Sequence, residues 1–141
     1  MRIFAIGDLH LPGGDNKPMD VFGPHWEGHF ERICADWRAR VSDEDAVLLP
    51  GDFTWAMQLK DALPDLMAVA ALPGKKLLCK GNHDYWWPSM TQLERALPEG
   101  MRALHHSAVD MGDYVVCGTR GWTLPTPDAP LSAEDARIFA R

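Results

Sequence analysis

Short apolar runs alternate along the chain with longer segments whose apolar residues recur every three or four positions. This alternation is typical of an α/β protein. Three runs predict strands, at residues 2–6, 46–49 and 74–80, and each is followed by glycine or by Pro-Gly. The second run is apolar throughout, as expected of a strand buried on both faces of a parallel sheet.

Helices are predicted between and after these strands. Apolar spacing predicts a helix over residues 26–41 and another over 56–72, in which Pro64 marks a kink or a break. Residues 11–24 between the first strand and the first helix are rich in Pro, Gly and Asp and predict a loop. Ser89 is placed to cap a further helix that runs to residue 97, because its hydroxyl can accept a free backbone N–H.

The pattern changes near residue 108. Residues 108–111 and 114–118 flank Gly112 and Asp113 and predict an antiparallel hairpin. Ser132 is predicted to cap a last helix of about three turns that meets the end of the chain. The predicted order is β-α-β-α-β-α followed by a hairpin. Without a stop signal or a partner strand after the last helix, we expect residues 1–141 to be a single domain whose C-terminal part is missing.

Composition and charge narrow the class of protein. The 141 residues are 46% hydrophobic and 24% charged, enough for the core of one domain. A net charge of −6 without a Lys/Arg run argues against nucleic acid or anionic lipid as a partner. A small phosphorylated substrate remains compatible, because a bound metal supplies positive charge locally.

Residues 1–7 contain no signal-peptide stretch and no membrane span is present, so we expect a cytoplasmic protein. The oligomeric state is left open.

Two sets of potential metal ligands indicate no site of their own. Cys34, Cys79 and Cys117 are odd in number and far apart, which predicts reduced, mostly buried thiols rather than a disulfide framework or a zinc knuckle. His25 and His29 are four residues apart, but the H-E-x-x-H order of zinc proteases is not met. A solvated start of a helix is the favoured interpretation for this pair.

Three motifs with acidic or histidine residues each follow a predicted strand: Gly7-Asp8-Leu9-His10, Gly51-Asp52 and Gly81-Asn82-His83-Asp84. Helical connections make these strands parallel, so the motifs are predicted to meet beyond the carboxyl edge of one sheet. Carboxylate, imidazole and amide donors suit divalent Mn, Fe or Zn. On an extended chain Asp8 and His10 point the same way, while Leu9 points into the sheet.

The order D-x-H, G-D, G-N-H-[DE] resembles the calcineurin-like metallophosphoesterases. The resemblance implies their α/β fold, a β-sandwich with flanking helices. It also implies hydrolysis of a phosphomonoester or phosphodiester by hydroxide activated between two divalent metal ions. Carried onto this sequence, it implies that Asp8 and His10 bind one ion, that Asp52 bridges both and that Asn82 binds the second.

The resemblance also implies roles at the substrate. His83 would contact the phosphate and protonate the leaving oxygen, while Asp84 would hold the His83 ring and keep its proton available near neutral pH. Arg120, beside Trp122, is a candidate phosphate ligand, with an exposed loop arginine as an equal alternative. Of Trp86 and Trp87, we expect one in the core and the other at the rim of the site.

The sequence departs from the family pattern in two ways. Protein phosphatases of the family have a second acid shortly after G-D, where this sequence has Phe53-Thr54-Trp55. The segments GNHDYWW and CGTRGW resemble a little-characterised bacterial branch of the family. The resemblance therefore does not identify the substrate. The later histidine motifs, including G-H-x-H, are absent, and His105 and His106 are expected at the surface. We therefore expect little activity from these 141 residues alone. Two alternatives stay open: a non-catalytic interaction scaffold on the same fold, and a metal-dependent nuclease.

Overall fold

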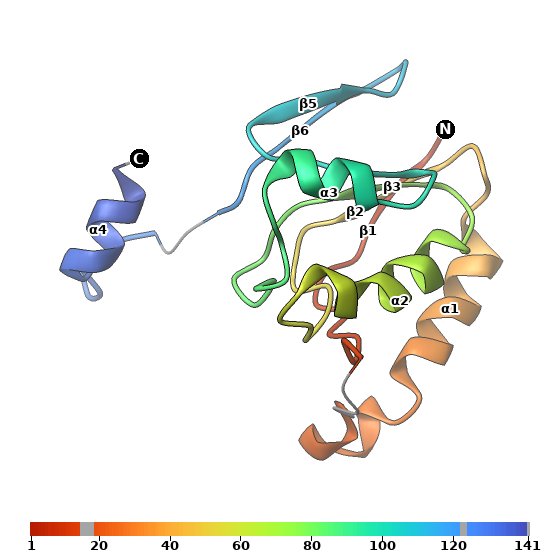
Figure 1. The fold of residues 1–141 in the computed structure, drawn as a ribbon, viewed down its shortest axis with the longest axis horizontal. Coiled ribbons are helices and arrows are strands. Elements are labelled where there is room, and N and C mark those ends of the chain that lie inside the picture. Colours follow the sequence, from red (N-terminus) through yellow and green to blue (C-terminus); the bar gives the residue numbers. More distant parts are fainter. Residues whose placement is uncertain (15–18, 122–123, 141) are drawn as a thin grey trace.

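A four-stranded parallel sheet forms the centre of the computed structural model, which describes residues 1–14, 19–121 and 124–140 (Figure 1). The strands lie in the order in which they occur: β1 (Ile3–Ala5), β2 (Ala46–Leu49), β3 (Lys75–Leu78) and β4 (Met101–Ala103). Each neighbouring pair is parallel. Parallel strands need a crossover connection, and three helices supply it: α1 (His29–Arg40), α2 (Leu59–Ala70) and α3 (Met90–Ala96).

One hydrophobic core joins the three helices to one face of the sheet. The register places Val47 opposite Lys76 and Leu49 opposite Leu78, so alternate residues of each strand share a face. This face contributes Val47, Leu49, Leu78, Met101 and Ala103 to the core, and the helices contribute Cys34, Trp37, Ala62, Leu66, Val69 and Leu93. The predicted α/β architecture is thereby confirmed, with the helices covering the face that carries these side chains.

The predicted hairpin is confirmed as a small second sheet, with β5 (Ser107–Asp110) antiparallel to β6 (Val115–Gly118). It meets the main sheet at Gly118, where a Cβ atom would lie 2.7 Å from Leu104 and 2.8 Å from the sulfur of Cys79. After the hairpin, α4 (Ala133–Phe139) lies apart from the sheet (Figure 1) and is shorter than the three turns predicted. Its predicted cap is confirmed, since Ser132 accepts the N–H of Asp135.

Three details of the sequence prediction are corrected. The strand β4 was not predicted, because its three residues contain a central Arg102 and no apolar run; pairing with β3 makes it a strand. The first helix begins at His29 rather than residue 26, since two short 3₁₀ helices, Met19–Phe22 and Pro24–Trp26, precede it. Pro64 lies inside α2 without breaking it, because the buried face of the helix offsets the lost hydrogen bond.

The three thiols are free, but their exposure differs from the prediction. Cys34 is buried, Cys79 is half-buried and Cys117 is exposed on the edge of the hairpin. Burial raises the pKa of the Cys34 and Cys79 thiols. Within the described ranges, no helix is both long enough and apolar enough to span a membrane.

Asp45 ties the start of the chain to the start of β2. Its buried carboxylate accepts hydrogen bonds from the side chain of Arg2 (2.8 Å), the backbone N–H of Arg2 (2.7 Å) and both the N–H and hydroxyl of Ser42 (2.9 Å each). The Arg2 side chain, followed by the two backbone donors, holds the pKa of Asp45 far below its usual value.

We expect this carboxylate to contribute to acid resistance. The unfolded chain binds a proton at Asp45 below about pH 4, whereas the folded chain does so only at much lower pH, so stability falls as the pH decreases through this window. Asp45→Asn should lower the thermal midpoint at neutral pH and flatten its decline between about pH 4 and pH 2. Calorimetry across that range measures both effects, and an unchanged slope would contradict the assignment.

Candidate metal centre

The loops that follow β1 and β2 run side by side beyond the ends of these strands. The backbone N–H of Asp8 donates to the carbonyl of Gly51 at 3.1 Å, and that of His10 donates to the carbonyl of Asp52 at 3.0 Å. These bonds extend the parallel pairing past the sheet, as the strand order predicts for motifs at one carboxyl edge. The first two motifs are therefore held in register by the backbone itself.

Three of the predicted ligands have an unusual backbone conformation. Asp8, His10 and Asp52 lie in the left-handed region, with φ of 55°, 43° and 53°. Residues with a side chain rarely adopt this region, although Asp and His do so more often than most. Each such residue costs about 1–3 kcal/mol, and such strain clusters at functional sites. Here it turns three potential donors toward the same point.

The side chains of these three residues converge. The Nε2 atom of His10 lies 3.6 Å from Oδ1 of Asp8 and 3.9 Å from Oδ2 of Asp52, and one donor atom from each residue lies within 4.8 Å of the others. Donors at 2.0–2.6 Å from one ion can be up to roughly 5 Å apart, so this spacing suits a shared cation. Leu9, between two of them, is buried in the core as predicted.

The third motif approaches from the end of β3. Asn82 and Gly81 line a hollow of about 200 Å³ together with Asp8, Asp52, Gly51 and Pro50. A Cβ atom on Gly81 would lie 2.1 Å from Oδ1 of Asp52, so only glycine permits this approach. The predicted ligands Asp8, His10, Asp52 and Asn82 are thus brought to one place.

The donor set fits a divalent cation. Two carboxylates face one imidazole, and in the described part of the chain they pair with His10 rather than with Lys or Arg. Nδ1 of His10 is buried and has no hydrogen-bond partner among the described residues. The His10 ring is instead held by stacking on Trp55, with centroids 4.5 Å apart. Mixed oxygen and nitrogen donors suit Mn, Fe or Zn.

His83 lies at the border of this cluster. Its backbone N–H donates to Oδ1 of Asp52 at 3.0 Å, and its ring centroid lies 6.0 Å from that of His10. The sequence therefore predicted correctly that the third motif reaches the first two. The chemical role of His83 remains a prediction, because the contacts describe position and not proton transfer.

Asp84 does not make the contact expected of it. Its carboxylate is completely buried and accepts four N–H groups, from Asp52 (2.9 Å), Phe53 (2.9 Å), Gly81 (2.8 Å) and the indole of Trp86 (2.9 Å). None belongs to the ring of His83. The physical reason is that a buried carboxylate needs several donors, and the two neighbouring loops present them. Asp84 thus clamps the second motif to the third.

The sequence pattern of the calcineurin-like phosphoesterases matches residues 1–130. The chain belongs to the calcineurin-like phosphoesterase family. Members of this family are phosphoester hydrolases that generally bind divalent metals, which agrees with the donors at the ends of β1 and β2.

A solved structure is also similar to this chain. It is a protein of unknown function from Aquifex aeolicus, with 22% sequence identity and a TM-score of 0.52 over 82% of this chain. This likeness supports the fold alone. The matched part covers 58% of the length of that protein. No curated protein matches the chain.

The burial of the other residues singled out in the sequence agrees with some of the predictions and contradicts others. Arg120 is half-buried, so it is not the exposed loop arginine of the alternative, and its role at a phosphate stays a prediction. Trp122 lies outside the described residues. Trp86 and Trp87 are both buried, at 2% and 9% exposure, so the expected tryptophan at the rim is wrong. The surface position of His105 and His106 is confirmed.

Two residues outside the three motifs, His29 and Asp65, support the ligand loops, and the sequence pattern did not predict this role. Nε2 of His29 lies 3.0 Å from the carbonyl of Leu9, so this histidine braces the first motif rather than lying free in solvent. In α2, the buried Asp65 accepts the N–H of Gly13 at 2.8 Å and contacts the hydroxyl of Thr54 at 2.5 Å. Burial raises the pKa of Asp65. An acid on the apolar face of a predicted helix was the available signal.

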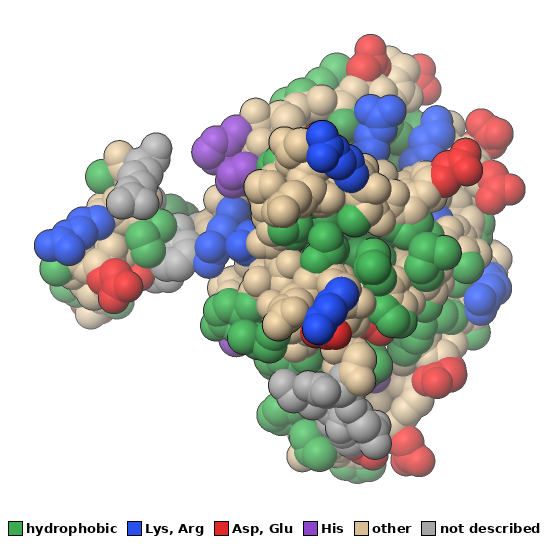
Figure 2. Space-filling view, viewed as in Figure 1, with side chains coloured by type: hydrophobic (Ala, Val, Ile, Leu, Met, Phe, Trp, Pro, Cys, Tyr) green, Lys and Arg blue, Asp and Glu red, His purple; other side chains and the backbone are tan. Residues whose placement is uncertain are grey.

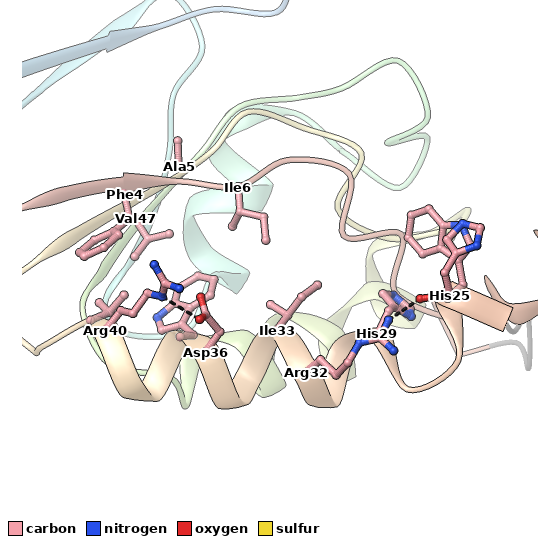
Figure 3. Close-up of a pocket in the computed structure, with 13 residues that line it drawn as sticks. Phe4, Ala5, Ile6, His25, His29, Arg32, Ile33, Asp36, Arg40 and Val47 are labelled. Carbon is pink, nitrogen blue, oxygen red and sulfur yellow. Dashed lines mark hydrogen bonds and ion pairs between the residues drawn. The ribbon is translucent and has the colours of Figure 1, made fainter. Parts of the chain in front are cut away.

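A larger cavity of about 480 Å³ lies between β1 and α1 and contains none of the predicted metal ligands. Figure 3 shows Phe4 of β1, Ile6 just after this strand and Ile33 of α1 facing it. At one end Arg40 is paired with Asp36 at 2.7 Å. Among the described residues, the group of donors close enough to share one ion is Asp8, His10 and Asp52 and not residues of this cavity, so the small hollow at the strand ends is the candidate site.

Proposed function

We propose that this protein hydrolyses a small phosphomonoester or phosphodiester at the hollow lined by Asp8, Asp52 and Asn82. One observation carries the proposal: donor atoms of Asp8, His10 and Asp52 converge within 4.8 Å in a member of a metal-dependent phosphoesterase family. Two divalent ions would supply positive charge at the phosphate and acidify the attacking water. Mn, Fe and Zn are the candidate ions.

In this proposal the ligands divide between two ions. Asp8 and His10 would hold the first, Asn82 would hold the second, and Asp52 would be shared. The two oxygens of Asp52 support the shared role, because Oδ2 faces His10 while Oδ1 accepts the N–H of His83 and lies against Gly81. Asp8 has an exposed side chain, which leaves the approach to the ions open from solvent.

His83 is the proposed general acid. It borders the ligand cluster, and protonation of the leaving oxygen by a positioned imidazole typically contributes about 10²–10⁴-fold to a rate. Its backbone bond to Asp52 ties the position of the ring to that of the shared ligand. Asp84 acts through the backbone of both loops and is a positioning residue in this scheme.

A small substrate is favoured over a nucleic acid. The hollow has a volume of about 200 Å³, and the chain carries a net charge of −6. Figure 2 shows Lys and Arg side chains dispersed among Asp and Glu on the face in view, without a continuous basic stripe. Nucleic-acid binding proteins usually present such a stripe to the phosphate backbone.

The proposal predicts metal-dependent hydrolysis. The protein should bind Mn²⁺, and its hydrolysis of p-nitrophenyl phosphate or the bis ester, expected to be slow in these 141 residues, should disappear on chelation and return when Mn²⁺, Fe²⁺ or Zn²⁺ is added. Bound metal per chain is measured by mass spectrometry and the rate by p-nitrophenol absorbance. A metal-free protein that neither binds these ions nor changes its rate when they are added would contradict the proposal.

A further inference from the structure

Three aromatic side chains, Trp55, His83 and Tyr85, form a row that begins at the ligand cluster, and we call this row the aromatic rim. Trp55 stacks on the ligand His10, with centroids 4.5 Å apart and ring planes 22° from parallel. The ring of His83 lies 5.4 Å from that of Trp55 and 6.4 Å from that of Tyr85. The rim thus leads outward from His10 to solvent.

Tyr85 is the exposed end of the aromatic rim. It is 62% exposed, whereas its neighbours Asp84 and Trp86 are 0% and 2% exposed. The N–H of Tyr85 donates to the carbonyl of His83 at 2.9 Å, and the indole of Trp86 donates to Asp84. The backbone is therefore held on both sides of a side chain that stands in water. An aromatic ring presented in this way loses little conformational freedom when a ligand covers it.

The position of His83 within the rim connects the rim to the reaction. His83 is the proposed donor of a proton to the leaving oxygen, so the group attached to that oxygen has to lie next to the His83 ring. On its outer side that ring is bordered by Tyr85, at 76° between ring planes. The part of the leaving group beyond that oxygen would therefore lie toward the exposed ring of Tyr85.

We propose that the aromatic rim binds the leaving group of the substrate and that this group contains a planar aromatic ring, as in an aryl or nucleoside phosphoester. Aromatic side chains stack on planar rings largely independently of the substituents on them. The inference rests on the function proposed above, because the rim meets a leaving group only when a phosphoester occupies the hollow.

Two phosphonates, one with an aromatic ring and one with a methyl group in its place, test the inference. Phenylphosphonate and methylphosphonate resist hydrolysis, and their binding to the Mn²⁺-loaded protein is measured by titration calorimetry. We expect phenylphosphonate to bind at least about tenfold more tightly, which corresponds to about 1.4 kcal/mol. A non-hydrolysable adenosine phosphonate tells the two sources apart: tighter binding than phenylphosphonate assigns a nucleobase, and weaker binding assigns a simple aryl ring.

Variants separate stacking from other roles of Tyr85. Tyr85→Leu should remove most of the preference for the phenyl ligand, and Tyr85→Phe should retain it, since the ring and not the hydroxyl makes the contact. Tyr114→Leu is the matched control, because Tyr114 is 51% exposed in the hairpin turn, away from the rim. It should bind both phosphonates as the unmodified protein does.

Three results would overturn the inference. Equal affinity for both phosphonates in the unmodified protein excludes the aromatic leaving group while leaving the phosphate site intact. Weaker binding of both ligands to Tyr85→Phe assigns the hydroxyl to the phosphate and rejects stacking. Binding of neither phosphonate to the Mn²⁺-loaded protein rejects the phosphoester site itself and the rim with it, so the two failures are distinguishable.

Discussion

Replacing Asp52 with Asn is expected to reduce phosphoesterase activity by more than the roughly 10²–10⁴-fold expected for His83→Ala. Asp52 is the proposed shared ligand, and its two oxygens face different sides of the site. An amide removes the negative charge that both ions need, whereas loss of His83 leaves the ligands in place. Metal per chain should therefore fall in Asp52→Asn and stay unchanged in His83→Ala.

The comparison needs a control for the loss of a carboxylate as such. Asp113→Asn makes the same chemical change at an exposed position in the hairpin turn and should keep both metal content and kcat/KM. Rates are measured with p-nitrophenyl phosphate at saturating Mn²⁺, and bound metal by mass spectrometry after gel filtration. A rate for Asp52→Asn within a few-fold of the unmodified protein would reject its role as a shared ligand.

Replacing Asp84 with Ala is expected to have the largest effect on stability. Four N–H groups, including those of Asp52 and Gly81, would lose a buried acceptor. Each unsatisfied buried donor costs about 1–3 kcal/mol, and dismantling a buried charged network typically costs about 3–5 kcal/mol. Because the same bonds clamp the second motif to the third, Mn²⁺ affinity should fall together with the free energy of unfolding.

Urea unfolding and Mn²⁺ titration measure these two effects. Asp84→Asn keeps one acceptor oxygen and should lose less than Asp84→Ala on both measures. Asp36→Ala removes an exposed carboxylate, paired with Arg40 in α1, and should change stability by no more than about 1 kcal/mol. If Asp84→Ala and Asp36→Ala had the same free energy of unfolding, the hydrogen bonds of Asp84 would not contribute to stability.

The elements of this fold differ in how well local pattern predicted them. The run Ala46–Leu49 was predicted with its bounds, because four consecutive apolar residues before Pro-Gly leave few alternatives. Ser89 and Ser132 were predicted as helix caps because capping depends on residues three positions apart. By contrast, β4 has only three residues, and its pairing with β3 rather than its composition makes it a strand.

The candidate site shows the same division. Motif order and strand context were sufficient to bring Asp8, His10, Asp52 and Asn82 to one edge of the sheet, because parallel strands present their carboxyl ends together. The partners of Asp84 were not predictable in this way. Its donors Asp52 and Phe53 are 32 and 31 positions away in the sequence. They become partners because the two loops approach each other in the folded chain.

From the sequence it could be predicted which acidic, histidine and amide residues meet and at which edge of the sheet they lie. How they are held depends on the folded chain: the left-handed turns at Asp8, His10 and Asp52, the close approach at Gly81, and the exposure of Tyr85 beside two buried tryptophans. The physical reason is that hydrophobic period and motif spacing act over a few residues. Hydrogen-bond partners and burial depend on segments that meet only after the chain has folded.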